Sequence, residues 1–108
     1  MNTVYEVVLD SATCAPGGSV SGRVAWKRVE PPREVEIRLF WQVVGGGVDD
    51  AYVADSREIP STSTEDEERF EFQLPGEPYT YEGTLFSIKW GVELLVDGRA
   101  SVAYFSMR

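Results

Sequence analysis

Every second residue between Phe86 and Val96 is apolar. The set is Phe86, Ile88, Trp90, Val92, Leu94 and Val96, and mostly polar or small residues separate its members. A period of two is typical of an extended strand with one buried face, because successive side chains of a strand point to opposite sides. A helix would scatter the same residues around its circumference. The pattern therefore predicts a strand over residues 85–96 and a fold in which a sheet covers a core.

Six further segments have strand-like patterns. They lie at residues 3–9, 20–27, 34–44, 52–57, 69–74 and 100–107. No amphipathic helix of useful length separates them, and seven strands in 108 residues are typical of two packed antiparallel sheets. We predict an all-β fold, a seven-stranded antiparallel immunoglobulin-like β-sandwich formed by residues 1–108 as a single domain. Trp41 and Trp90 should meet in its interior.

The segments between the predicted strands have turn chemistry. Proline or glycine marks residues 15–18 and 45–47, and Asp97–Gly98 is a hairpin signal. A polar loop is expected over 61–68. It carries four acidic residues, Glu65, Asp66, Glu67 and Glu68. The simplest interpretation is a solvated loop tip, and the functional one is a docking patch for lysine or arginine.

The net charge of −8 limits the classes of partner. Phosphate backbones and anionic lipid surfaces would be repelled, so nucleic acid is not expected as a partner. No apolar run approaches the ~20 residues of a membrane helix, so membrane insertion is not expected either. The charge favours a basic protein partner, or serves solubility alone.

The chain has one cysteine, Cys14, which cannot form an internal disulfide. A lone thiol suits a reducing compartment, and the N-terminal sequence lacks the basic region and cleavage site of a signal peptide, so we predict a cytoplasmic protein. Cys14 lies beside a predicted turn, and the chain has no histidine to activate it. We expect a structural rather than a reactive thiol.

The residues that usually carry catalysis are scarce. Histidine is absent, there is no G-x-S-x-G element, and a single thiol rules out a cysteine-based zinc site. We therefore expect no enzyme activity and no cofactor. Asp49, Asp50 and Asp55 offer hard oxygen ligands, so calcium binding stays open, although adjacent acids at turns are usually just solvated.

Five short segments follow one another in an order that is specific to a known fold. They are APGGSVSGRV at 15–24, VEIRL at 35–39, FQLP at 72–75, PYTYEG at 78–83 and SIKW at 87–90. The first is similar to a P-G-x-x-V-x-G-x-V opening, and the last three are similar to an F-x-L-P … P-x-S-Y-x-G … I-x-Y signature. Together they resemble the arrestin-like β-sandwich domains, which include bacterial sporulation-control proteins.

The resemblance implies one half of an arrestin and a general binding or scaffolding role. It implies no specific binding residue, because the matching positions are structural glycines, prolines and core aromatics. The partner of such a half would be a second arrestin-like half on another chain, a second copy, or an unrelated protein.

Our leading hypothesis is a non-catalytic protein-binding or scaffold domain that acts through its sheet edges or by self-association. Phe40 lies on the predicted solvent side of its strand, and Phe40 and Phe105 would give that surface apolar area. The ordinary interpretation of Phe40 is a lone surface aromatic. The alternative is a small carbohydrate- or ligand-binding sandwich, either with or without a dependence on calcium. The three tryptophans fall at core positions, which leaves fewer rings to stack on a sugar.

Overall fold

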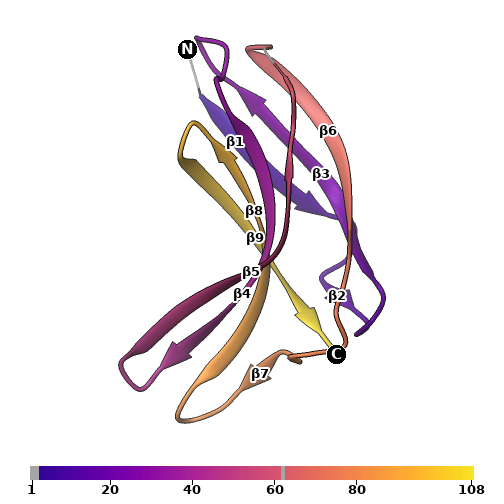
Figure 1. Cartoon of the computed structure of the whole chain (residues 1–108), viewed down its shortest axis with the longest axis vertical. Coiled ribbons are helices and arrows are strands. Elements are labelled where there is room, and N and C mark those ends of the chain that lie inside the picture. The colour runs from indigo at the N-terminus through magenta and orange to yellow at the C-terminus, as the bar shows by residue number, and fades with distance from the viewer. Residues whose placement is uncertain (1–2, 62) are drawn as a thin grey trace.

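The protein consists of β-strands packed in two layers (Figure 1). The computed structural model describes residues 3–61 and 63–108, and within these residues there are nine strands and no helix that could cross a membrane. The strands are β1 (Val4–Leu9), β2 (Thr13–Cys14), β3 (Ser19–Lys27), β4 (Val35–Gly45), β5 (Val48–Glu58), β6 (Glu65–Gln73), β7 (Tyr81–Glu82), β8 (Ser87–Val96) and β9 (Arg99–Met107). The all-β sandwich is confirmed. The two-residue strands β2 and β7 were not predicted, so nine strands replace the expected seven.

The smaller sheet has the order β1-β3-β6, and both of its pairings are antiparallel. Alternate residues of β3 point into the sandwich, and Val20, Val24 and Trp26 are at most 1% exposed. Phe70 and Phe72 of β6 enter the same interior. The alternation predicted for residues 20–27 is therefore confirmed.

The larger sheet has the order β2-β9-β8-β4-β5, with β7 attached to β8. Trp41 of β4 lies opposite Trp90 of β8, and Leu39 lies opposite Val92. These inward pairs bring the apolar faces of the two longest predicted strands together. One pairing departs from the antiparallel prediction, because β2 runs parallel to the end of β9.

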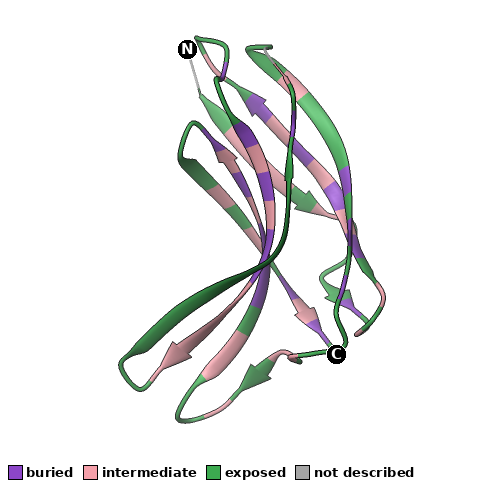
Figure 2. Ribbon diagram, viewed as in Figure 1, coloured by how far each residue is buried: buried purple, intermediate pink, exposed green. Residues whose placement is uncertain are grey.

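The core lies where the two sheets face each other (Figure 2). Trp90, Val92 and Leu94 have no exposed surface there. The ring centroids of Trp41 and Trp90 are 6.4 Å apart, as the expected meeting requires, but Trp41 is only partly buried. Trp41 is less covered because the β4–β5 and β7–β8 hairpins extend away from the smaller sheet (Figure 1).

The predicted loop at 61–68 is wrong in its second half. Residues 65–68 form the first part of β6, where Glu65 lies opposite Lys27 and Glu67 lies opposite Ala25 of β3. An edge strand faces solvent on one side, so it accepts charged residues that a central strand would not. Arg23 also lies 3.9 Å from the Glu67 carboxylate, which offsets part of the negative charge.

Phe40 and Phe105 are buried, which contradicts the predicted exposure of both side chains. Phe105 lies opposite Trp90 on the inner face and is 4% exposed. Phe40 points outward but is only 8% exposed, because Gly91 beside it on β8 leaves room for the ring to lie flat on the sheet. The ring of Tyr104 packs edge-on against Phe40 at 6.2 Å.

The family-like segments of the sequence hold distant parts of the chain together. The side-chain amide of Gln73 donates to the carbonyl oxygens of Gly17 and Gly18, and the Gly17 amide donates to Pro75. Glycine is needed at position 22 for a different reason, because a Cβ there would overlap the carbonyl oxygen of Val8 on the neighbouring strand. These residues fix the fold, as expected from their type.

Candidate functional site

The β5 strand is the open edge of the larger sheet. It pairs with β4 on one side only, and all eleven of its residues are exposed. The edges of the smaller sheet are less open. The β1 strand lies against β9, and on β6 the Arg69 carbonyl oxygen accepts a 3.0 Å bond from the guanidinium of Arg57. Among the described strands longer than two residues, β5 is therefore the one whose residues are all exposed.

The β5 edge is regular from Val48 to Val53. The turn residues Gly46 and Gly47 both have positive φ, which is typical of a two-residue hairpin loop in which the flanking residues form a hydrogen-bonded pair. Counting from that pair, the amides of Asp49, Ala51 and Val53 point away from β4. A register shift opposite Leu39 and Phe40 interrupts the edge beyond Val53.

Two aromatic pairs lie on the inner face of the larger sheet, Trp41 with Tyr52 on β4 and β5, and Tyr81 with Phe86 at the β7–β8 hairpin. The rings of Trp41 and Tyr52 are stacked at 4.3 Å, and those of Tyr81 and Phe86 lie 5.1 Å apart. Tyr52, Tyr81 and Phe86 are 45%, 48% and 41% exposed, so this part of the inner face has no covering layer.

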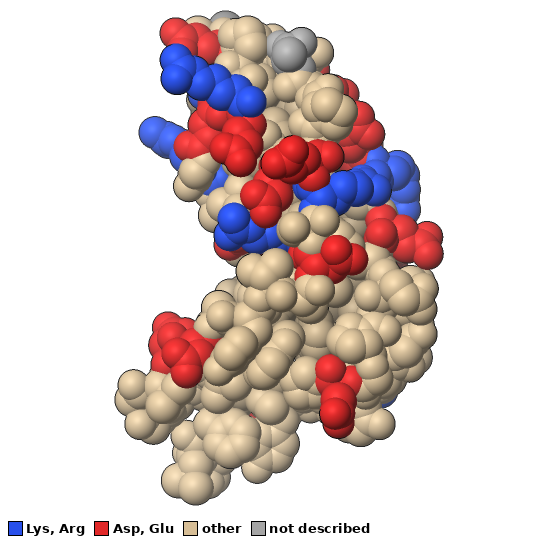
Figure 3. All heavy atoms as spheres, viewed as in Figure 1, with Lys and Arg blue, Asp and Glu red and all other residues tan. Residues whose placement is uncertain are grey.

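Charge is unevenly spread over the face seen in Figure 3. Lysine, arginine, aspartate and glutamate side chains crowd the half that contains the smaller sheet, and the half formed by the two hairpins is mostly uncharged. The sequence predicted burial for Phe86 from its alternation with Trp90. It had no signal that the sheet would extend past its covering layer at this end.

The acidic side chains of β5 do not gather around one point where a metal ion could bind. Asp49 and Asp50 are consecutive in a strand and point to opposite faces. The carboxylate of Asp55 accepts a bond from the Ser56 amide. No group of three candidate ligands suited to a metal occurs among residues 3–61 and 63–108, so the three aspartates do not form the calcium site that was left open.

Glu65, Asp66, Glu67 and Glu68 do not form an acidic loop tip. They follow the edge of β6, and Asp66 accepts a 2.9 Å bond from the Ser61 hydroxyl. Successive acids point to opposite sides of the strand, so the four carboxylates do not make one patch.

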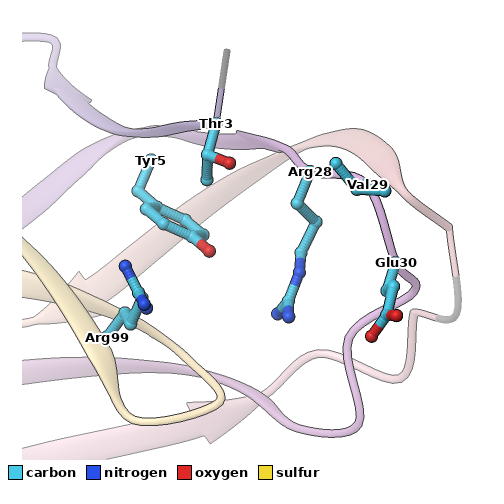
Figure 4. A pocket seen from close by; sticks show the side chains of 6 residues that line it. All are labelled: Thr3, Tyr5, Arg28, Val29, Glu30 and Arg99. Carbon is cyan, nitrogen blue, oxygen red and sulfur yellow. The ribbon is translucent and has the colours of Figure 1, made fainter. Parts of the chain in front are cut away.

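A surface cavity of about 270 Å³ lies between β1, the β3–β4 connection and the β8–β9 turn. The guanidinium groups of Arg28 and Arg99, the Tyr5 hydroxyl and the Glu30 carboxylate face its space (Figure 4). Arg28 is bound to Asp97 at 2.7 Å, which ties it to the β8–β9 turn.

Asp97 joins these segments. Its carboxylate accepts bonds from the backbone amides of Glu34 and Arg33 as well as from Arg28. The Glu34 amide is the main cause that lowers the pKa of Asp97 below its usual value, and the Arg33 amide and Arg28 contribute in the same direction. The cavity is thus bordered by a clamp that holds the β3–β4 connection in place.

Cys14 does not contribute reactive chemistry. The residue lies in β2 and is 8% exposed, and burial raises the pKa of its thiol. A raised pKa lowers the thiolate fraction, so the structure supports the structural role expected for this residue.

Solved structures resemble this chain in fold at low sequence identity. Spo0M, a sporulation control protein from Bacillus subtilis, matches 98% of the chain with a TM-score of 0.69 and 16% identity. The alkylpurine DNA glycosylase AlkC from Pseudomonas fluorescens, bound to DNA, matches 94% with a TM-score of 0.51 and 14% identity. A β-glucosidase from Listeria innocua matches 97% with a TM-score of 0.52 and 15% identity.

These matches bear on the fold and not on activity. The chain spans 49% of the Spo0M chain, 29% of AlkC and 16% of the glucosidase. No family model matches the sequence, and no curated protein matches it. The likeness to Spo0M confirms the arrestin-like β-sandwich that the sequence segments indicated.

Proposed function

We propose that this chain is a non-catalytic protein-binding domain that pairs its β5 edge with an extended segment of a partner protein. The single observation that carries this proposal is the exposure of β5 along its whole length. Unpaired amides and carbonyls at a sheet edge bind an added strand through main-chain hydrogen bonds, with specificity supplied by alternate side chains.

The composition also supports the proposal. The scarcity of catalytic side chains favours a binding role over catalysis. The lone buried thiol of Cys14 favours a reducing compartment such as the cytoplasm. Three kinds of chain could supply the segment: a separate protein of the same half-arrestin type, a second copy of this chain, or an unrelated protein.

Substitution of Ala51 by proline tests strand pairing. Proline removes an outward amide hydrogen and keeps the β4–β5 bonds, whereas serine at the same position keeps the hydrogen. We expect dodecapeptides selected from a random display library on the wild type to bind Ala51→Ser equally and Ala51→Pro about tenfold more weakly, from loss of a main-chain bond and clash. Selected peptides that bind Ala51→Pro as well as the wild type would contradict the proposal.

A sugar-binding role is the second candidate, favoured by the exposed rings of Tyr52, Tyr81 and Phe86. Such rings stack on the apolar faces of sugars. Thermal-shift measurements with an oligosaccharide panel, with and without calcium, separate the two functions. A rise in melting temperature that Tyr52→Ala abolishes would favour sugar binding, and no rise with any glycan would rule it out for that panel.

A further inference from the structure

We infer that the segment that pairs with β5 carries two consecutive basic residues and a large apolar residue two positions from the second of them. This inference rests on the proposed pairing at β5 and adds the chemistry of the partner. The order is basic-basic-any-apolar for a segment parallel to β5, and the reverse for an antiparallel one.

The basic pair follows from the positions of Asp49 and Asp50. They are neighbours in the strand and point to opposite faces, so neighbouring residues of an added strand lie beside them on opposite faces too. No lysine or arginine occurs in β5 before Arg57. Opposite charges on adjacent strands stabilise pairing, and like charges destabilise it. A basic residue is therefore favoured at both positions.

The apolar residue follows from Tyr52. It lies on the same face as Asp50, two residues further along, and stacks on Trp41 at 4.3 Å. This stacking holds the Tyr52 ring in place, while 45% of the residue stays exposed. An apolar side chain on the added strand would cover part of that surface.

The same chemistry excludes a second copy of this chain as the partner. Lys27–Arg28 is the one consecutive basic pair in the sequence. Lys27 belongs to β3, which already pairs with β1 and β6 on its two sides. Pairing of β5 with a second β5 near the hairpin tip would bring aspartates together. The inferred partner is a different protein.

Peptide binding by charge-swapped variants tests this inference. The probes are synthetic dodecapeptides with Lys-Arg-Thr-Ile, the reversed order Ile-Thr-Arg-Lys, or Glu-Glu in place of the basic pair, and binding is measured by fluorescence anisotropy. We expect wild type to bind a basic peptide about tenfold more tightly than its acidic counterpart, and the double variant Asp49→Lys with Asp50→Lys to reverse that preference. Tyr52→Ala should weaken binding, and Tyr52→Phe should retain it.

Circular dichroism first has to show that the variants fold. The outcomes then separate strand pairing at β5 from the inferred basic-and-apolar sequence of the partner. Equal binding of basic and acidic peptides, or no binding of either, would overturn the inference. If Ala51→Pro still weakens the binding of library-selected peptides about tenfold, strand pairing would stand without the basic pair. A charge-dependent binding that Ala51→Pro leaves unchanged would overturn strand pairing and the inference with it.

Discussion

A side chain at Gly22 or Gly91 would overlap a neighbouring strand. At Gly22 the neighbouring β1 backbone occupies the volume of a side chain, and at Gly91 the ring of Phe40 does so. The second case explains why an outward phenylalanine is buried. A flexible ring can move away from a new Cβ, whereas a backbone carbonyl in a paired strand cannot, so Gly22 is the less tolerant position.

Replacement of Gly22 by alanine should lower the free energy of unfolding by about 1–3 kcal/mol, because the new methyl group forces β1 away from β3. Urea denaturation followed by tryptophan fluorescence measures the change. Gly76→Ala is the matched control, since a Cβ there meets no atom within 4 Å, and it should change stability by no more than about 0.5 kcal/mol. Equal effects at the two positions would refute the close approach.

At the scale of elements, turns are fixed by contacts from other parts of the chain. The β8–β9 turn places Asp97 at a φ of 50°. Its carboxylate then binds the amides of Arg33 and Glu34, more than sixty residues earlier in the sequence. The Asp97 backbone amide in turn donates to the Glu34 carbonyl. The turn and the β3–β4 connection therefore form one unit.

The lowered pKa of Asp97 predicts a pH dependence of stability. Because the carboxylate is favoured in the folded protein, its contribution is present above the unfolded pKa of about 3.9 and is lost as pH falls through the lower folded value. Asp97→Asn should lower stability at pH 7 and flatten the loss of stability below pH ~4. Asparagine also accepts the positive φ.

Urea midpoints between pH 2 and 7 measure this dependence. Asp55→Asn is the control, because among residues 3–61 and 63–108 the Asp55 carboxylate bonds only to its neighbouring amide. An acid-induced loss that is equally steep in wild type and Asp97→Asn would show that the clamp does not respond to protonation.

The whole molecule has two halves with different surfaces. The two-layered half carries most of the charge on the face of Figure 3, with ion pairs such as Arg23–Glu6 at 3.2 Å. The hairpin half has one layer and exposed aromatic rings. The exposed aromatic rings therefore lie in the half that carries little charge on this face.

The net charge of −8 leads us to expect no binding to DNA, even though the fold is shared with a DNA glycosylase that was solved on DNA. Fluorescence anisotropy with a labelled 20-base-pair duplex at 0.15 M salt should give no saturable signal up to about 0.1 mM protein. Saturable binding that weakens as salt is added would contradict the exclusion of nucleic acid.

The sequence by itself determined where the seven longer strands lie, to within a few residues, and which face of most of them is apolar. Alternation is a local property, so Trp90, Val92 and Leu94 were placed on the buried face without any knowledge of their neighbours. Glycine and proline marked where the chain turns for the same reason, since each of them limits or widens the local backbone conformations. The strand pattern also led to the hypothesis of binding through a sheet edge, but it did not indicate which edge is open.

The tertiary structure alone decided what covers each face. Phe86 and Trp90 share one alternation, yet Trp90 is buried and Phe86 is exposed, because the β7–β8 hairpin extends away from the smaller sheet (Figure 1). Phe40 is buried by a glycine on another strand, and Glu65 lies in a strand because β3 offers a partner. Burial and pairing depend on residues distant in the chain, and a pattern along one strand carries no information about them.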